Sequence, residues 1–123
     1  MSKLTWFLII AVVGSIGLLV YQMNAEKGPG KYDAFADCLT EKGVKMYGAY
    51  WCPHCANQKR MFGSSWDRVT YVECAIEGQN VQTQICQKEG IKSYPTWDFG
   101  FERQTGELSF AQLSEKTGCA LPQ

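Results

Sequence analysis

The hydrophobic pattern divides the chain into two unequal parts. Residues 4–21 read LTWFLIIAVVGSIGLLVY and hold no charged side chain, whereas short apolar runs alternate with polar ones after residue 31. Eighteen helical residues span about 27 Å at about 1.5 Å per residue, close to the roughly 30 Å hydrocarbon core of a bilayer. Because the segment is apolar on every face, it predicts a membrane-spanning helix rather than a helix of a soluble core.

A cleaved signal peptide is the main alternative for this segment. Cleavage sites follow a small-x-small pattern, and Met23 interrupts that pattern before Ala25. We therefore expect the segment to remain as an uncleaved signal-anchor, followed by a linker with the sequence Gly-Pro-Gly. The predicted organisation is a transmembrane signal-anchor, a linker and one domain, over residues 1–22, 23–31 and 32–123 respectively.

The part of the chain after the linker predicts alternating helices and strands. Apolar residues at helical spacing and glycine stops indicate four helices, over residues 32–42, 53–62, 81–89 and 111–117. Runs rich in β-branched and aromatic residues indicate four strands, over residues 44–50, 69–74, 96–99 and 107–110. The order α-β-α-β-α-β-β-α implies a parallel pair of strands with a right-handed crossover, then a hairpin. We predict an α/β fold with a mixed sheet and helices on both faces.

Charge and cysteine content narrow the function. Lysine plus arginine and aspartate plus glutamate both total 12, so the chain lacks the basic excess of a nucleic-acid binder and no nucleic-acid partner is expected. Hydrophobic residues make up 46% of the chain, too many for a disordered protein. Six cysteines in 123 residues favour redox chemistry, metal binding or an oxidising compartment.

The orientation of the predicted anchor rests on these cysteines. The charges beside the apolar segment, Lys3 against Glu26, Lys27 and Lys31, are nearly balanced and favour neither orientation. An oxidising compartment suits the cysteines, so we place the N-terminus in the cytoplasm. The protein is then expected to lie in the cell membrane as a single-pass protein, anchored through residues 4–21, with an extracytoplasmic domain.

The segment Cys52-Pro53-His54-Cys55 is the predicted chemical centre. It lies between the first strand and the following helix, and this spacing brings both sulfurs to the first helical turn, within reach of a disulfide. The N–H groups and dipole at the helix start favour the thiolate of Cys52 over its thiol. Thiolates carry out disulfide exchange, so Cys52 is the expected nucleophile and Cys55 the resolving thiol.

Other uses of this motif fit less well. A zinc site needs four ligands, yet the chain has one histidine and no second C-x-x-C, although zinc could still recruit Cys74 and Cys86. A haem-attachment site needs histidine after the second cysteine, where this chain has Ala56. A purely structural disulfide is the remaining alternative. We expect no metal and no cofactor beyond a redox-active disulfide.

The residues around this motif resemble the thioredoxin superfamily. Trp51-Cys52-Pro53-His54-Cys55 follows a hydrophobic strand, and Tyr94-Pro95-Thr96 opens another strand about forty residues later. The resemblance implies a thioredoxin-like fold in which Pro95 follows a cis peptide bond and packs against the active-site disulfide. It also implies that Tyr94 presents backbone groups to the substrate chain.

A more specific resemblance covers most of the domain. The runs KMYGAYWCPHCANQKRMFG, VTYVEC and IKSYPTWDF are similar to the thioredoxin-like domain fused to bacterial and plant vitamin K epoxide reductase homologues. In that family the domain is extracytoplasmic and passes oxidising equivalents between protein thiols and a membrane-embedded quinone reductase. The resemblance therefore implies exported protein thiols as substrates. It implies a separate vitamin K epoxide reductase-like or DsbB-like membrane protein as redox partner.

Two side chains bear on the direction of electron flow. His54 can place positive charge near the Cys52 thiolate, which stabilises the reduced form and makes a stronger oxidant; a solvent-exposed helix residue is the alternative. The Pro-His pair resembles DsbA-type oxidases rather than reducing thioredoxins. Six positions before Cys52, where thioredoxins bury a carboxylate, this chain has Met46. Lys45 or Glu73 could replace that proton acceptor only if the fold brings one of them to the thiol.

The four remaining cysteines are expected to be structural. Among three possible pairings, we favour Cys74 with Cys86, which closes a local connection, and Cys38 with Cys119, which joins the first and last helices of the domain. A relay function for Cys74–Cys86 is the alternative. Trp51 and Tyr94 are predicted to form an apolar docking surface for extended polypeptide.

The leading hypothesis is a membrane-anchored thiol–disulfide oxidoreductase that oxidises exported proteins. A reductase or isomerase, for example in cytochrome c maturation, is the second hypothesis. A non-enzymatic binding module stabilised by disulfides is the third.

Overall fold

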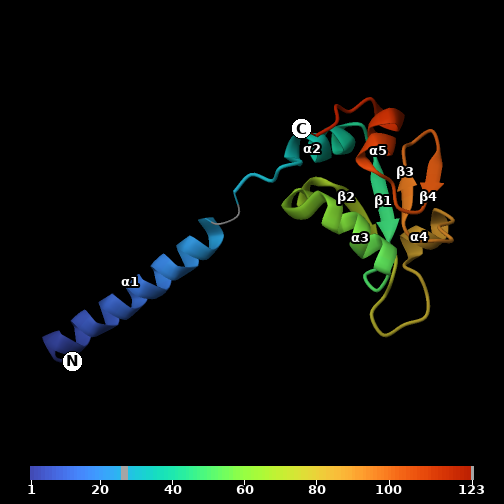
Figure 1. Cartoon of the computed structure of the whole chain (residues 1–123). Helices are drawn as coiled ribbons and strands as arrows, with labels where there is room; N and C mark the ends of the chain where they lie inside the picture. The colour runs from blue at the N-terminus through green and yellow to red at the C-terminus, as the bar shows by residue number, and fades with distance from the viewer. Residues whose placement is uncertain (26–27, 123) are drawn as a thin grey trace.

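The N-terminal helix is the longest element of the protein. The computed structural model describes residues 1–25 and 28–122, so Glu26 and Lys27 of the predicted linker and Gln123 lie outside the described residues. Helix α1 (Lys3–Ala25) lies away from the rest of the protein (Figure 1). From Lys3 to Met23 it is long and apolar enough to cross a membrane, with a mean hydropathy of 2.3, a property that signal sequences share. Its large apolar side chains are exposed.

The domain is built on a four-stranded sheet with the order β2-β1-β3-β4. Strand β1 (Lys45–Gly48) pairs in parallel with β2 (Thr70–Glu73), as the predicted strand-helix-strand opening requires. Strand β3 (Thr96–Asp98) pairs antiparallel with β1 and with β4 (Arg103–Thr105). The mixed α/β architecture is therefore confirmed, and it is compatible with a thioredoxin-like fold.

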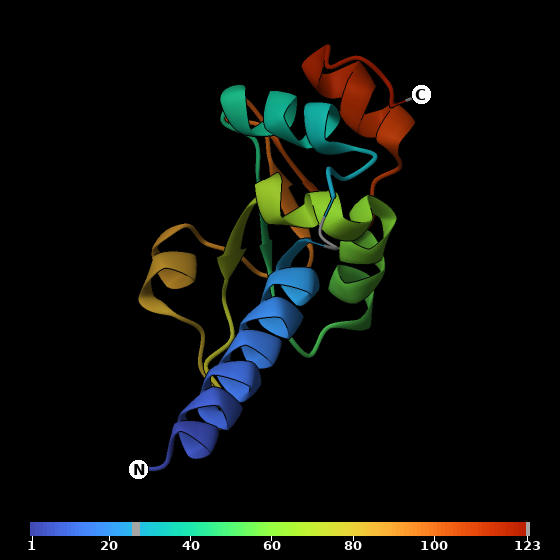
Figure 2. The same cartoon turned by 90° about the vertical axis from the view of Figure 1, so that its left-hand side faces the viewer.

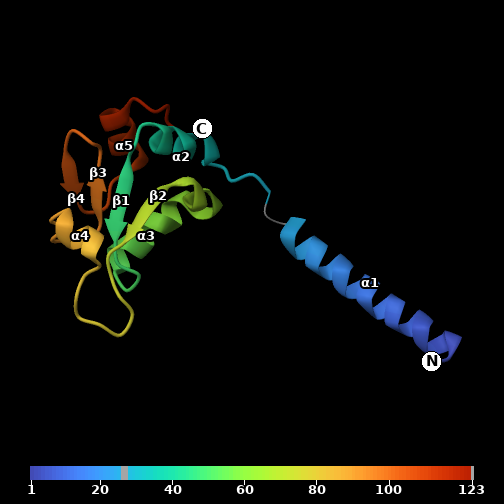
Figure 3. The ribbon, with the colours of Figure 1, turned by 180° about the vertical axis from the view of Figure 1, so that it is seen from behind.

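Helices cover both faces of this sheet. Helices α2 (Asp33–Glu41), α3 (Pro53–Phe62) and α5 (Phe110–Thr117) share the larger hydrophobic core with Met46 and Trp97. On the opposite face Tyr47 packs with the disulfide that holds the short helix α4 (Gln84–Lys88). Helices α2 and α5 lie side by side at one end of the sheet (Figure 2), whereas α4 and the loop before it lie at the other end (Figure 3).

The closing hairpin differs from the prediction. The second strand of the hairpin, predicted over residues 107–110, is β4 at Arg103–Thr105. Asp98 sets this tighter turn, because its carboxylate accepts a hydrogen bond from the N–H of Gly100 (2.8 Å) and one from Nε of Arg103 (3.0 Å). The predicted segment instead leads into α5, where Ser109 is the N-cap residue of a capping box.

Two further elements differ in extent. Helix α4 begins at Gln84 rather than at residue 81, because the preceding residues form a loop that pairs with the chain just after β2 through an isolated Ala75–Gln82 bridge. The chain after α3 does not pass directly into a strand. A 3₁₀ helix, η1 (Gly63–Arg68), precedes β2, and Arg68 at its end pairs with Asp37 of α2 (2.9 Å).

Candidate functional site

The start of α3 positions the two cysteines of the motif. Cys52 is the N-cap residue and Pro53 occupies the first turn, where the absence of an N–H costs no helical hydrogen bond. The turn before the helix is closed by a hydrogen bond from the N–H of Cys52 to the carbonyl of Ala49 (3.0 Å). No side chain caps the helix. The positive end of the helix dipole is therefore open to a negative charge on Cys52.

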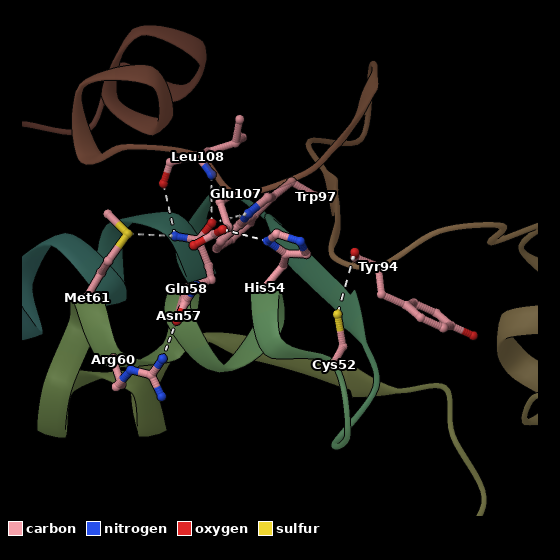
Figure 4. A network of polar contacts seen from close by, with 10 residues as sticks. All are labelled: Cys52, His54, Asn57, Gln58, Arg60, Met61, Tyr94, Trp97, Glu107 and Leu108. Carbon is pink, nitrogen blue, oxygen red and sulfur yellow. Dashed lines mark hydrogen bonds and ion pairs between the residues drawn. The ribbon is translucent and has the colours of Figure 1, made fainter.

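The loop before β3 meets Cys52 from the other side of the site. The Tyr94–Pro95 peptide bond is cis, as the resemblance implies. The Sγ atom of Cys52 lies 3.7 Å from the carbonyl oxygen of Tyr94 (Figure 4). The ring of Trp51, which is 61% exposed, meets the ring of Tyr94 edge to face at 5.9 Å. The structure thus brings Trp51, Cys52 and the Tyr94–Pro95 loop together.

Cys55 lies deeper, beneath the first turn of α3, with an exposed fraction of 1%. Burial, the largest cause, raises the pKa of its thiol from 9.0 to about 11, and the neighbouring Cys52 adds to this rise. Cys52 is 7% exposed, and neither residue is in a disulfide. Cys52 is therefore the more exposed of the two thiols, while Cys55 remains a protonated thiol at neutral pH until it reacts.

His54 faces a carboxylate that the sequence analysis did not identify. Its Nδ1 lies 2.8 Å from Oε2 of Glu107, and the side chains are 68% and 35% exposed respectively. In Figure 4 the imidazole points toward Glu107, while Cys52 points toward Tyr94. An exposed ion pair of this kind contributes about 0 to 1 kcal/mol to stability. Its main effect is to orient the His54 ring toward Glu107.

One turn further along α3, a buried glutamine holds the helix against the segment that leads into α5. The Gln58 amide oxygen accepts from Nε1 of Trp97 (3.1 Å) and from the N–H of Leu108 (2.7 Å), while its NH₂ group donates to the Leu108 carbonyl (2.9 Å). These bonds fix α3, β3 and the Glu107 segment together (Figure 4). Sequence reasoning missed Gln58, because nothing in its spacing separates a buried amide from a solvated one.

The remaining four cysteines form two disulfides with the pairing that we favoured. Cys38 is bonded to Cys119, and Cys74 is bonded to Cys86. Both sulfurs of the second pair belong to residues that are fully buried. A relay through Cys74–Cys86 would need access that the static structure does not provide, and these sulfurs cannot complete a zinc site while bonded to each other.

Metal ligands do not gather elsewhere in the part of the chain that the structure describes. Within residues 1–25 and 28–122 there is no group of three or more His, Cys, Asp or Glu side chains that could hold a metal ion.

Comparison with known proteins points to the same chemistry. No protein-family model matches the chain. The chain is 37% identical over 115 residues to the thiol-disulfide oxidoreductase LTO1 of Arabidopsis thaliana. The aligned region covers 89% of this chain but 31% of LTO1, so the chain spans about a third of the length of this relative. The similarity supports a relationship between this chain and thiol-disulfide oxidoreductases.

Proposed function

We propose that the protein is a thiol–disulfide oxidoreductase whose Cys52–Cys55 pair exchanges with the thiols of other proteins. One observation carries this proposal. Of the six cysteines, four are bonded in disulfides, and the two that are free lie at the start of a helix beside the Tyr94–Pro95 loop. The similarity to LTO1 supports the same reaction class.

The proposed exchange has two steps. In the oxidised protein, a substrate thiolate attacks Sγ of Cys52, forms a mixed disulfide and releases Cys55 as the leaving thiolate. A second substrate thiolate then attacks the mixed disulfide, which leaves the substrate oxidised and Cys52 as a thiolate. The exposed Trp51 ring and the backbone of Tyr94 would contact the substrate chain on either side of the reacting sulfur, with Pro95 holding that loop in place.

We further propose that the protein acts as an oxidase of exported proteins, anchored by α1 and reoxidised by a quinone reductase of the vitamin K epoxide reductase or DsbB type. The Pro53-His54 pair between the cysteines supports this direction. The membrane-length helix supports the anchor. A reductase or isomerase would use the same cysteines with the opposite flow of electrons, and a binding module would use neither.

The direction of flow is tested by the reduction potential of the Cys52–Cys55 pair in the full chain. A potential near −120 mV, the value of a strong oxidase, supports the oxidase. A potential near −270 mV, the value of thioredoxin, would overturn it. Equilibration with glutathione and quantification of the alkylated thiols measures this potential, and Cys38–Cys119 and Cys74–Cys86 serve as internal references because they should stay oxidised.

The reaction class is tested by trapping. The Cys55→Ala variant lacks the resolving thiol, so mixed disulfides between Cys52 and client proteins should accumulate and disappear on reduction. The matched control Cys52→Ala should trap nothing. A Cys55→Ala protein that forms no mixed disulfide in its native membrane would favour the binding module instead.

A further inference from the structure

The reacting thiol at Cys55 needs a route for its proton. Each exchange either releases Cys55 as a thiolate or requires its thiol to lose a proton before attack. Cys55 is 1% exposed, so bulk water cannot serve it directly. Its pKa of about 11 means that the thiolate takes up a proton at neutral pH. The groups packed around this sulfur therefore decide how fast the proton moves.

A second polar group, the hydroxyl of Tyr71, lies near this sulfur beside Gly48. A Cβ atom added to Gly48 would lie 2.9 Å from Sγ of Cys55 and 3.1 Å from the hydroxyl oxygen of Tyr71. Both atoms therefore border the same small space on the β1 backbone. Tyr71 stands opposite Met46 on the neighbouring strand, so its side chain projects to the sheet face that α3 covers.

Glu73 continues the path toward the surface. It lies two residues after Tyr71 on β2, opposite Gly48, and strand alternation places it on the same face. The Tyr71 hydroxyl donates a hydrogen bond to Oε2 of Glu73, and the N–H of Tyr50 donates one to Oε1 (2.8 Å). Burial and the bond to Glu73 raise the pKa of Tyr71, so this residue stays a neutral hydroxyl. Glu73 itself is partly exposed.

Two further titratable groups, on α3 and at its N-cap, lie near Cys55, Tyr71 and Glu73. Nζ of Lys59 lies 3.9 Å from the centre of the Tyr71 ring, and its charge lowers the pKa of Cys55 against the larger effect of burial. Cys52 faces Cys55 from the start of the helix and raises that pKa. The carboxylate of Glu73 is thus the acidic side chain in direct contact with the Tyr71 hydroxyl, and Lys59 is the nearby cation.

We propose that Tyr71 and Glu73 form a proton path between Cys55 and solvent, in which the Tyr71 hydroxyl serves the sulfur and Glu73 acts through Tyr71. This inference rests on the proposed exchange at Cys52–Cys55 but holds for either direction of electron flow. The sequence names Glu73 as a candidate proton acceptor, and the fold adds the Tyr71 hydroxyl, which contacts Glu73 and lies near the Cys55 sulfur beside Gly48.

The proton balance is the same in both directions. When Cys55 attacks a mixed disulfide at Cys52, its thiol proton passes to the Tyr71 oxygen as the Tyr71 proton passes to the Glu73 carboxylate, which later releases it to water. The sulfur lone pair forms the Cys52–Cys55 bond, and the substrate sulfur leaves as a thiolate. When Cys55 is instead the leaving thiolate, Tyr71 protonates it and regains a proton from Glu73, which takes that proton up from water.

The test separates the two sulfurs with Ellman's reagent. In the full chain in detergent, with only Cys52 and Cys55 reduced, attack by Cys52 releases one thionitrobenzoate and leaves a second bound as a mixed disulfide. Attack by Cys55 releases the second in a phase whose rate does not depend on reagent concentration. Stopped-flow absorbance resolves both phases, so Glu73→Gln and Tyr71→Phe can be compared with the native protein across pH.

General acid–base catalysis contributes typically about 10²- to 10⁴-fold. We expect both variants to slow the second release at least about tenfold at neutral pH. The rate of this release should then rise steeply with pH, while the first release changes less than about twofold. The matched controls are Glu77→Gln, which removes an exposed carboxylate after β2, and Tyr47→Phe, which removes a hydroxyl on the other sheet face. Neither control should alter either phase.

The outcomes distinguish this proposal from the function on which it rests. If the second release keeps its rate and pH profile in both variants, or if both releases slow equally, the proton path is wrong. If the native protein gives no first release, the exchange at Cys52 is wrong. Should Glu73→Gln fail to fold, Tyr71→Phe decides, because it keeps the ring that packs against Trp66.

Discussion

Two cysteine pairs lie on opposite faces of the same strands. Cys52 and Cys55 belong to the α3 face, where Gly48 brings β1 close to the Cys55 sulfur. Cys74 and Cys86 belong to the α4 face, and the N–H of Cys74 donates to the carbonyl of Gly48 (2.8 Å). Gly48 of β1 thus lies beside a cysteine of each pair. The cysteines of the first pair are free, whereas those of the second are bonded to each other.

The difference shows that burial alone does not separate a reactive pair from a structural one, because all four residues are buried. Position relative to a helix start does separate them. Cys52 is the N-cap residue of α3, whereas Cys74 follows β2 and Cys86 lies inside α4. The proposed reactivity of Cys52 therefore follows from the helix start rather than from exposure, since Cys55 is nearly as buried as the two bonded cysteines.

The sharpest way to break the comparison is to remove cysteine sulfurs from one face at a time. Cys52→Ser should lower the rate of thiol–disulfide exchange at least about a thousandfold, because loss of a covalent nucleophile removes the reaction path itself. The double variant Cys74→Ser/Cys86→Ser should retain most of that rate. Insulin reduction or oxidation of a dithiol peptide measures both, and equal losses would contradict the assignment of separate functions.

The disulfides are expected to differ from each other in stability. Cys38–Cys119 closes a loop of sequence separation 81, and Cys74–Cys86 one of 12. In the chain-entropy treatment, their removal costs about 4.5 and about 3 kcal/mol respectively. Denaturant unfolding of each Cys→Ser double variant measures this order. A larger loss for Cys74–Cys86 would mean that local packing around α4, rather than loop length, dominates.

The buried thiol of Cys55 should lower the stability of the fold at alkaline pH. Because the pKa of Cys55 in the fold (about 11) exceeds 9.0, the unfolded chain loses this proton first, so stability falls as pH rises from about 9 to 11. At about 1.4 kcal/mol per pKa unit, the full loss is about 2 to 3 kcal/mol. Cys52→Ala should show part of this loss, because burial is the largest cause of the raised pKa and Cys52 adds to it, and Cys52→Ala/Cys55→Ala should show none, by unfolding at several pH values. Identical pH profiles would contradict the burial effect.

The smallest expected effect on stability comes from a substitution at Gly48, the β1 residue that lies beside both cysteine pairs. Gly48→Ala places a Cβ 2.9 Å from both the Cys55 sulfur and a ring carbon of Tyr71. Both distances are too short, so these side chains or the strand must shift. Overpacking of this kind costs about 1 to 3 kcal/mol, measured by thermal unfolding. The Cys74–Cys86 face should be unaffected, because the Gly48 carbonyl still accepts from Cys74. A substitution without effect on stability would show that Cys55 and Tyr71 can shift at no cost and that the α3 face is not tightly packed here.

Local rules predicted much of this structure. Pro53 at the helix start, the glycine stops and the parallel pair around α3 all follow from spacing and residue type, and so does the cysteine pairing. The second hairpin strand was misplaced, because the side-chain bonds of Asp98 to Gly100 and Arg103 that fix the turn leave no hydrophobic pattern. Helix α4 was predicted too long, because the Ala75–Gln82 bridge that holds the preceding loop also leaves no hydrophobic pattern.

The site is predicted where the chain itself brings residues together, and, for the cis Tyr94–Pro95 loop, only through the resemblance to the thioredoxin superfamily. Cys52, His54 and Cys55 are neighbours in sequence, whereas Glu107 and Gln58 meet the site or its support only through the packing of α3 against the segment before α5. Tyr71 and Glu73 share a face by strand alternation, but the face is decided by register with β1. A glycine at position 48 is a signal of close approach that could have been read.

The Cys38–Cys119 bond has a consequence for how the protein could be handled in a cell. It closes the chain into a covalent ring that contains every residue assigned to chemistry, while α1 and the Gly28–Gly30 segment lie outside that ring. A protease that cuts between the helix and the ring would release the domain without opening it. The proposed membrane attachment and the proposed redox chemistry would thus be separable by a single cleavage, which leaves the ring of residues 38–119 closed.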